Sequence, residues 1–405
     1  MESQISGRWG GTGRAGGGAR DGAPRGGGAA ARRGAWGGSW PGPGRWAAGP
    51  GGVGAGARPP PESPAGGPLL ARAELAPGLE VSRVVKGCWQ LSGGHRGDAA
   101  SDRTQGQKAV EDFGAFERAG VTAFDTADIY GPSEKLVGSY LKARGGVQGV
   151  QVLTKLCVFD PQEMRNAGST DFVRGRLKES TRKLGAKPDL VQFYWHRYEI
   201  PNYVDCALRM AEARDAGRFG HLGLTNFDTE RVQAFVEAGV KPEVHQVQYS
   251  LLDRRVENGM SEYCQAQGIT LLPYGVLAGG FLSEKYLGVE PRDVRQDTYS
   301  KDKYASIIRQ SGGWSWFQVL LGELSLVAQK HRTTIANVAT AWVLGRPCVP
   351  AVLIGARNAE HVGDLAGLDA LRLDAQDLKR IDDVLEEGRR PTGDFYTWER
   401  GGGKF

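Results

Sequence analysis

The chain has 405 residues, 24% of them charged and 40% hydrophobic, which is enough for one large globular domain with a sizeable core. Of the 61 glycines, 23 fall within residues 1–70, and residues 1–74 contain nine arginines, no lysine and four acidic residues. This first segment therefore carries the whole formal net charge of +5, and the remainder of the chain is close to neutral. The balance argues against a folded nucleic-acid-binding domain with a basic face.

Residues 1–75 are expected to form a disordered Gly/Arg-rich leader, because they hold few large aliphatic side chains. Three interpretations stay open: an organellar targeting segment, an RNA-contacting tail, and a low-complexity extension. The composition is Arg-rich and acid-poor like a transit peptide but lacks its serines. The expected location is therefore cytoplasmic or the stroma of a plastid or other organelle. The sequence GTGRAG at 11–16 matches a dinucleotide-binding fingerprint, but no strand precedes it, so the match is attributed to chance.

The cysteines are widely spaced and odd in number, and none form a C-x-x-C pair. That spacing argues against a disulfide framework and a zinc site, and it is typical of a reducing compartment. No run of about 18 apolar residues is present, so no membrane span is expected. The five cysteines are Cys88, Cys157, Cys206, Cys264 and Cys348.

Beyond the leader, short β-branched runs alternate with amphipathic helical stretches. Strands are predicted at 81–89, 122–126, 150–157, 189–196, 221–226, 243–249, 270–276 and 349–355. Helices are predicted at 107–119, 133–142, 170–184, 203–216, 229–238, 259–267, 316–331, 334–344, 358–368 and 375–386. Eight β-α units predict a single-domain α/β protein, a (β/α)8 TIM barrel over residues 76–405. An open doubly wound sheet is the alternative. Residues 278–314 are expected to form a long loop that covers the site.

Polar side chains follow the predicted strands where a barrel places its site. Asp125 and Tyr130 follow the second strand, and Lys155 ends the third. A tyrosine has a pKa near 10, and a neighbouring ammonium lowers it while a carboxylate holds the ammonium in place. Such a group can exchange a proton with a carbonyl oxygen or an alcohol. No cluster of metal ligands is present, so no metal is expected.

Four segments together carry a resemblance to a known family: FDTADIYG at 124–131, the Lys155 strand, GLTNF at 223–227 and QVQY at 246–249. In this order they resemble the aldo-keto reductase superfamily, over roughly residues 80–370. The resemblance implies an NADP(H)-dependent oxidoreductase that interconverts a small-molecule carbonyl substrate and its alcohol by hydride transfer. Tyr130 is then the proton donor, Lys155 its partner and Asp125 the partner of Lys155. The sequence contains no motif that indicates the substrate or an oligomeric state.

The same resemblance implies the cofactor site. Asn226 and Gln246 would hold the nicotinamide carboxamide with Thr225 beside them, and Tyr274 would stack on the ring. The glycine-containing loop after Tyr274 would wrap the pyrophosphate, and a segment near residue 355 would meet the adenosine phosphate. Pairing of Arg357 with a 2′-phosphate favours NADP(H), although NAD(H) is not excluded. The implied loop and segment residues are Gly275, Leu277, Gly279, Gly280, Gly355, Ala356 and Arg357.

One position departs from the family. Its histidine usually falls five residues after the aspartate that opens the fourth strand, and here that position is Tyr194, counted from Asp189. His196 lies two residues further, so both side chains are expected on one face of the strand. Either His196 serves in catalysis, or Tyr194 replaces the histidine. The second case leaves room for a regulatory or redox-sensing barrel that binds NADP(H) with little turnover.

Overall fold

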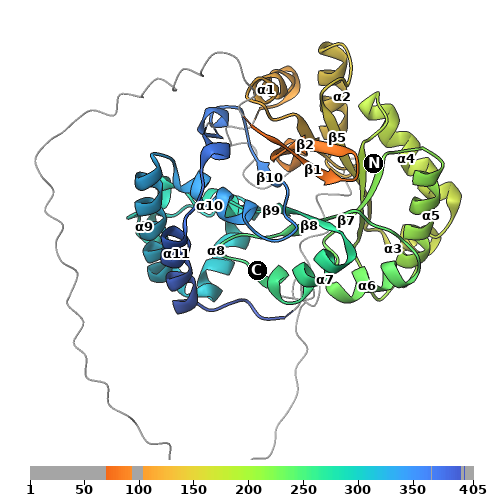
Figure 1. The fold of residues 1–405 in the computed structure, drawn as a ribbon. Coiled ribbons are helices and arrows are strands. Elements are labelled where there is room, and N and C mark those ends of the chain that lie inside the picture. Colours follow the sequence, from red (N-terminus) through yellow and green to blue (C-terminus); the bar gives the residue numbers. More distant parts are fainter. Residues whose placement is uncertain (1–69, 94–103, 366, 394–395, 397–405) are drawn as a thin grey trace, which may run out of the picture. The chain divides into compact units, whose positions relative to one another are not determined.

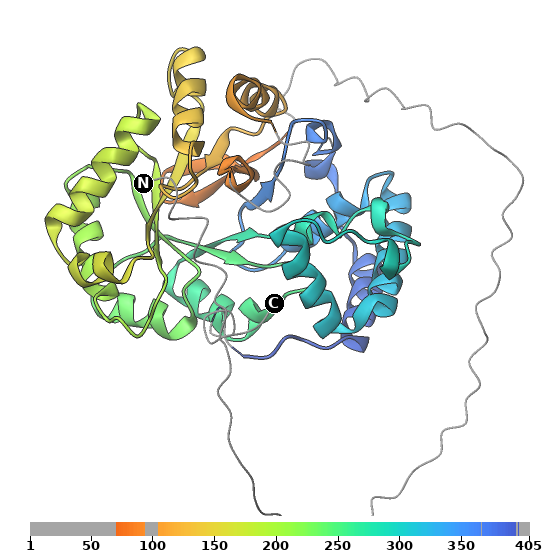
Figure 2. The same ribbon diagram turned by 180° about the vertical axis from the view of Figure 1, so that it is seen from behind.

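The structure is a computed structural model that describes residues 70–93, 104–365, 367–393 and 396. Its centre is a parallel eight-stranded sheet enclosed by helices, seen from two opposite sides in Figures 1 and 2. Its strands are β3 (Val84–Gly87), β4 (Ala123–Asp125), β5 (Gln151–Val158), β6 (Leu190–Trp195), β7 (His221–Thr225), β8 (Val244–Gln248), β9 (Thr270–Tyr274) and β10 (Val352–Gly355). A separate antiparallel hairpin comprises β1 (Arg72–Ala76) and β2 (Leu79–Ser82).

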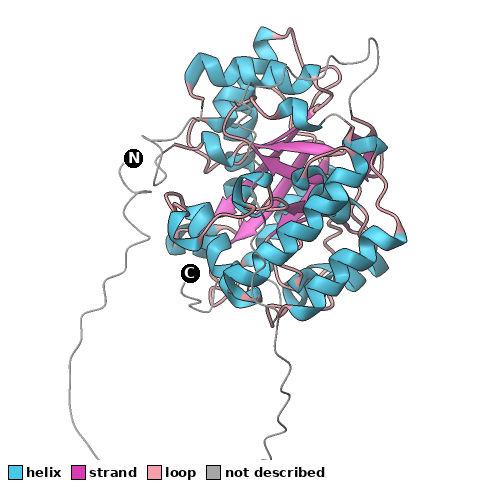
Figure 3. Ribbon diagram, turned by 90° about the vertical axis from the view of Figure 1, so that its left-hand side faces the viewer, coloured by secondary structure: helices cyan, strands magenta, loops and turns pink. Residues whose placement is uncertain are grey.

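The helices follow the strands along the chain and form a layer around them (Figure 3). They are α1 (Gly106–Arg118), α2 (Ser133–Ala143), α3 (Pro161–Asn166), α4 (Thr170–Leu184), α5 (Tyr203–Asp215), α6 (Thr229–Glu237), α7 (Met260–Gln267), α8 (Tyr299–Ser311), α9 (Gly313–His331), α10 (Ile335–Leu344) and α11 (Ala375–Glu387). None of the helices in the described residues is both long enough and apolar enough to cross a membrane.

The sheet closes on itself. Its hydrogen-bonded order is β10-β3-β4-β5-β6-β7-β8-β9, and every neighbouring pair in it is parallel. At the remaining seam β9 lies against the segment that leads into β10, where the Leu271 N–H donates to the Cys348 carbonyl over 2.7 Å. The predicted (β/α)8 TIM barrel is thus confirmed, and the doubly wound alternative is wrong.

The hairpin forms a floor for the barrel. Leu75, Leu79 and Val81 are buried in one apolar cluster with inward-facing residues of seven barrel strands. These barrel residues are Val85, Ala123, Leu153, Leu190, Val244, Leu272 and Leu353. Because side chains alternate along a strand, the next inward positions toward the carboxyl ends form a second layer. On four of the strands this layer is polar and comprises Asp125, Lys155, Gln192 and Gln246. The site therefore lies above a closed apolar base.

Helix α4 illustrates how local sequence fixes these elements. The Ser169 hydroxyl accepts the Phe172 N–H at the start, and Gly185 ends the helix at a φ of 66°. Between them Val173 and Leu177 are buried at helical spacing. This face places Arg176, one residue before Leu177, over the end of β5.

Four expectations about the elements need correction. The predicted strand at 81–89 is divided into β2 and β3, and β1 begins within the expected leader, at Arg72. The predicted loop at 278–314 contains α8, capped by the Thr298 hydroxyl. No α-helix forms at 358–368, where the described residues have short 3-10 turns and Gly367 adopts a φ of 81°. The rest of the leader, residues 1–69, lies outside the described residues.

Candidate active site

A buried ion pair lies above the apolar floor. The Lys155 ammonium, from β5, contacts the Asp125 carboxylate at the end of β4, and both side chains are only 3% exposed. The ammonium also donates to the Thr126 carbonyl over 2.8 Å. Burial by itself would lower the pKa of Lys155, but Asp125, together with smaller contributions from Tyr130 and Cys157, outweighs burial, and the net pKa lies above its ordinary value. Lys155 is thus a fixed positive charge.

Two glutamines complete the coordination of Asp125. Gln192 of β6 donates from Nε2 to Asp125 Oδ1 over 2.7 Å, and Gln246 of β8 donates from Nε2 to the same oxygen over 3.0 Å. Gln246 Nε2 also lies 2.9 Å from Gln192 Oε1. Sequence reasoning missed Gln192. The signal was present, because Gln192 lies two residues before Tyr194 and so shares its face of β6.

Tyr130 lies beside the ion pair, in the turn between β4 and α2. Lys155 Nζ is 5.0 Å from the centre of the phenol ring, and the Trp89 indole packs edge-on against that ring at 5.1 Å. Burial raises the pKa of Tyr130 well above its usual value, and the Lys155 ammonium offsets only part of this effect. The expected action of Lys155 is present, but the expected net lowering of the tyrosine pKa is wrong.

Close packing and a salt bridge fix the turn that carries Tyr130. Gly131 has a φ of 47°, and a Cβ there would overlap the Ser92 carbonyl oxygen. Asp128 accepts the Cys157 N–H and pairs with Arg176 Nη2 at 2.5 Å. Arg176 also donates to the Cys157 carbonyl over 2.9 Å. The turn is therefore fastened to β5 and α4, which keeps Tyr130 near Lys155.

Tyr194 and His196 lie on one face, as predicted. The Tyr194 hydroxyl is 3.0 Å from His196 Nδ1, and the Phe159 ring packs against both rings at 4.9 Å between centroids. Tyr194 shares the inward face of β6 with Gln192, further toward the carboxyl end, and His196 directly follows the strand. They form a joined aromatic pair at the barrel mouth, with Tyr194 the nearer to the Asp125 layer.

The predicted nicotinamide-binding residues occupy the ends of β7 and β8. Asn226 has a φ of 62°, and its N–H donates to the Gln246 carbonyl over 3.1 Å. The next N–H, of Phe227, donates to Nε2 of the buried His245 over 3.2 Å. Burial lowers the pKa of His245 to about 3, so this ring is a neutral acceptor. Thr225 is buried beside Asn226.

The predicted phosphate loop follows β9 and packs against α8. Gly275 and Gly279 have φ values of 72° and 66°, respectively. A Cβ at Gly275 would overlap the Tyr304 hydroxyl, and one at Gly279 would lie 2.9 Å from Tyr304 Cδ2. Leu277 is partly buried, and Gly280 has a φ of 90°. Lys303 Nζ lies 5.5 Å from the centre of the Tyr274 ring. Helix α8, unforeseen from the sequence, thus adds a cation to this loop.

The predicted adenosine-phosphate segment begins at Gly355, the last residue of β10, and continues directly after the strand. A Cβ at Gly355 would overlap the Gln90 side chain, so Gln90 packs directly on this backbone. The Ala356 and Arg357 carbonyls accept hydrogen bonds from Lys86 and from the Thr104 N–H, respectively. The Arg357 residue is exposed.

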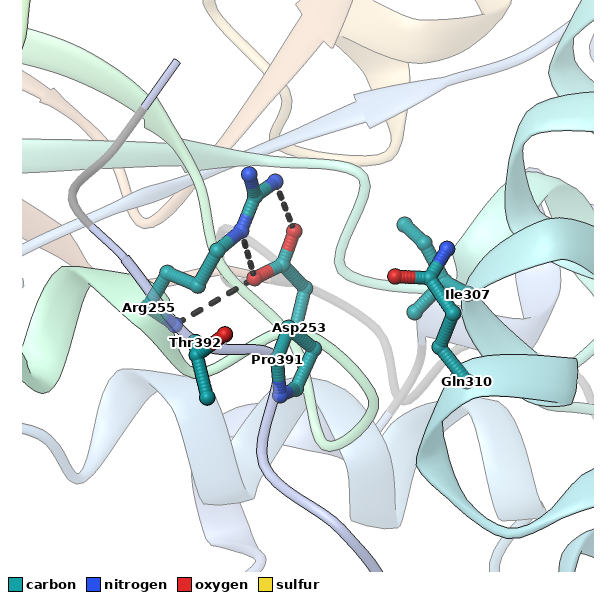
Figure 4. Close-up of a pocket in the computed structure, with 6 residues that line it drawn as sticks. All are labelled: Asp253, Arg255, Ile307, Gln310, Pro391 and Thr392. Atoms are coloured by element: carbon teal, nitrogen blue, oxygen red, sulfur yellow. Dashed lines mark hydrogen bonds and ion pairs between the residues drawn. The ribbon is translucent and has the colours of Figure 1, made fainter. Parts of the chain in front are cut away.

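A small cavity of about 50 Å³ has a lining that includes neither Asp125 nor Lys155 (Figure 4). Asp253 and Arg255 face each other there, with Arg255 Nη2 2.7 Å from Asp253 Oδ2. Gln248 Nε2 donates to the same aspartate over 2.5 Å, which connects the pair to the end of β8. A volume of this size accommodates no more than a few water molecules. Its lining comprises Asp253, Arg255, Ile307, Gln310, Pro391 and Thr392.

Within the described residues, no three His, Cys, Asp or Glu side chains converge as metal ligands. The site is a barrel mouth with a tyrosine beside a buried lysine–aspartate pair, an arrangement that is chemically capable of proton exchange.

The comparisons with known proteins identify the family of this barrel. A model described as "Aldo/keto reductase family" matches residues 83–386, so the chain belongs to that family of oxidoreductases. It is 28% identical over 325 residues to the aldo-keto reductase YhdN of Bacillus subtilis (strain 168), covering 76% of this chain and 91% of the relative.

Solved structures share the fold. The glycerol dehydrogenase of Gluconobacter oxydans superposes with a TM-score of 0.65 at 24% identity, covering 80% of this chain and 97% of that chain. An aldo/keto reductase from Klebsiella pneumoniae, solved in complex with NADP and acetate, superposes with a TM-score of 0.59 at 21% identity. This second alignment covers 80% of this chain and 96% of the other.

Proposed function

We propose that the protein is an NADP(H)-dependent reductase that converts an aldehyde or ketone to an alcohol, or catalyses the reverse reaction. The observation that carries the proposal is the placement of Tyr130 beside the Lys155–Asp125 ion pair at the carboxyl ends of the barrel strands. Membership of the aldo/keto reductase family and the similarity to a structure solved with NADP support it.

The residues present fit a dinucleotide. Gly275 and Gly279 let the backbone of the loop run close to Tyr304, because a Cβ at either position would be too near that side chain. Lys303 lies over the Tyr274 ring at the same loop. Asn226 and Gln246 would hold the nicotinamide carboxamide, and Arg357 would pair with the 2′-phosphate. The remaining predicted contacts are Thr225, Leu277, Gly280, Gly355 and Ala356. When bound, the cofactor supplies or accepts the hydride.

The proton that the carbonyl oxygen needs is supplied by a side chain of the protein. Tyr130 is protonated at neutral pH, since the ordinary tyrosine pKa is near 10 and burial raises the pKa of Tyr130 further. Its hydroxyl therefore donates to the carbonyl oxygen as that oxygen gains charge. The adjacent Lys155 ammonium stabilises the phenolate that remains, and Asp125 holds the ammonium in place. In the reverse reaction the same phenolate accepts the alcohol proton.

The Tyr194–His196 pair lies next to this centre and supports a role for the tyrosine that stands where the family usually has a histidine. Tyr194 occupies the inward position nearer to the Asp125 layer, and His196 is within hydrogen-bond distance of its hydroxyl. We propose that Tyr194 contacts the carbonyl oxygen and that His196 acts through it. A barrel that binds NADP(H) with little turnover is the second candidate, favoured by the raised pKa of Tyr130 and by the tyrosine at position 194.

The test uses the full chain. NADPH and NADH are titrated by tryptophan fluorescence, and NADPH absorbance is then followed with a panel of aldehydes and ketones for the parent protein and Tyr130→Phe. The reductase proposal expects tight NADPH binding, measurable turnover, and loss of turnover without loss of binding in Tyr130→Phe. Tight binding without turnover on any carbonyl would favour the second candidate. Absence of binding by either nucleotide would contradict both.

A further inference from the structure

Lys86 is a buried lysine outside the proposed proton-transfer centre. It lies on β3 and is 2% exposed. Its neighbour Val85 faces the apolar floor of the barrel, so the Lys86 side chain points the other way, toward α1. There its ammonium lies 4.7 Å from the centre of the Phe116 ring and 5.6 Å from that of Phe113. These two rings contribute a cation–π interaction.

No carboxylate among the described residues lies within ion-pair distance of this ammonium. Asp112 of α1 acts on it electrostatically, but the Asp112 carboxylate accepts a hydrogen bond from the Thr104 hydroxyl instead. Burial lowers the pKa of Lys86. A methionine would fill similar space without the desolvation penalty of an ammonium, so packing alone does not account for a lysine here.

The oxygen that this ammonium contacts belongs to the segment at 355–357. Lys86 Nζ donates to the Ala356 carbonyl over 3.4 Å. The Thr104 N–H donates to the next carbonyl, of Arg357, over 2.9 Å, and Gln90 packs on Gly355. Three groups from β3 and the chain that follows it therefore contact three successive residues: Gly355, which ends β10, and the two residues after it. These are residues that the proposed function assigns to the adenosine end of the cofactor.

We propose that Lys86 is a positioning residue for the adenosine half of the cofactor site: through the Ala356 carbonyl it fixes the backbone that presents Arg357. This inference rests on the proposed NADP(H) function. Lys86 does not touch the cofactor, and its influence passes through one carbonyl oxygen. Its loss therefore affects recognition of the adenosine half and leaves the Tyr130 chemistry, on the other side of the strand, unaffected.

The experiment measures the two halves of the cofactor separately in the full chain. Lys86→Met is compared with the parent protein for binding of adenosine 2′,5′-bisphosphate, NADPH and reduced nicotinamide mononucleotide. We expect the dissociation constants for the first two to rise by the same factor, about tenfold for the loss of one hydrogen bond from a charged donor. Binding of the mononucleotide and kcat at saturating NADPH stay within about twofold.

A core variant on α1 separates positioning from general loss of stability. Val110→Ala removes buried volume from the same helix and lowers Tm, but it leaves the Lys86–Ala356 contact in place. The proposal expects unchanged affinity for the bisphosphate in this variant. If Lys86→Met does not fold, Lys86→Gln, which keeps a shorter neutral donor, is measured in its place with the same expectation of weaker binding.

The outcomes are distinct. Unchanged bisphosphate affinity in the Lys86 variant, or an equal loss in Val110→Ala, overturns the role of Lys86 and leaves the proposed function standing. A fall in kcat equal to the loss of affinity also overturns it, because the effect then reaches the proton-transfer centre. If the parent protein binds neither NADPH nor the bisphosphate, the proposed function fails, and the role of Lys86 fails with it.

Discussion

Gln192 donates a 2.7 Å hydrogen bond to the carboxylate oxygen of Asp125 that faces away from Lys155. This bond joins β6 to the ion pair and leaves Asp125 satisfied on both oxygens. We predict that Gln192→Leu lowers kcat by about tenfold or more, because a hydrogen bond to a charged group contributes about 1.5–3 kcal/mol. Gln192→Glu should be more damaging, since it brings a second carboxylate to Asp125. Steady-state kinetics test this, with the exposed Gln162→Leu as control. Equal activity in all three variants would contradict the assigned role.

Neutralising the carboxylate of the pair should separate catalysis from binding. Asp125→Asn leaves the Lys155 ammonium buried without a charged partner, which costs about 3–5 kcal/mol of stability. We expect a large fall in kcat, a lower Tm and little change in NADPH affinity. Thermal denaturation and fluorescence titration measure the last two. The exposed Asp205→Asn should change none of these quantities, and a parallel loss in that control would remove the support for Asp125.

We predict that protonation of the buried His245 lowers the free energy of unfolding in acid. Its pKa is about 3 in the folded protein and near 6.5 in the unfolded chain, so the unfolded state binds the additional proton between these values. The stabilising contribution is fully present above pH 6.5 and is lost as the pH falls toward 3, by at most about 5 kcal/mol. Tm should fall less steeply with acid in His245→Gln, which keeps an acceptor for the Phe227 N–H but does not titrate. Parallel curves for the two proteins would exclude His245 as the source.

The contact between Gly275 and Tyr304 can be isolated with a matched glycine. Gly275 has a φ of 72°, and Gly288 has a φ of 75° with open space around it. Gly288→Ala carries only the backbone penalty, about 1 kcal/mol, whereas Gly275→Ala also displaces Tyr304. We expect a larger fall in Tm and weaker NADPH binding in Gly275→Ala alone. If the two alanine variants were equally affected, α8 would not be closely packed on this loop.

The leader and the hairpin should respond differently to truncation. A chain that begins at Leu70 keeps β1, and we expect it to retain the Tm and reductase activity of the full chain. A chain that begins at Pro77 loses β1 and with it Leu75, which packs on the barrel floor, so its Tm should fall by several degrees. Equal melting temperatures would show that β1 does not stabilise the barrel. Loss of activity from the longer truncation product, with an unchanged Tm, would assign the leader a part in function.

Local sequence predicted the barrel well because each unit carries its own signals. The strand at 190–195 alternates Gln192 and Tyr194 with Phe193 and Trp195, and helix α4 has both a cap and an apolar stripe. The proximity of Asp125 and Lys155 was predictable from the same alternation of strands and helices, because parallel barrel strands have their carboxyl ends at one rim.

Features that depend on distant partners were not predictable in this way. Helix α8 has buried residues at helical spacing, such as Tyr304 and Ile308, but their burial depends on packing against the loop after β9. The net pKa of Tyr130 depends on how deeply the turn is buried, which no local pattern encodes. The expected helix at 358–368 shows the converse: its local apolar pattern is that of an amphipathic helix, yet the described residues there form only short 3-10 turns.

The β1–β2 hairpin closes one end of the barrel, so the interior opens only at the carboxyl ends of the strands. Leu75, Leu79 and Val81 occupy the end opposite Tyr130, and the strand residues packed against them fill the interior up to the Asp125 layer. Anything that reaches Tyr130 enters and leaves through the rim that also carries Asn226 and the loop after β9. If cofactor and substrate both bind above this floor, as the proposed function requires, we expect the one seated deeper to bind first and to leave last. Product-inhibition patterns of the ordered kind are the kinetic signature of this geometry.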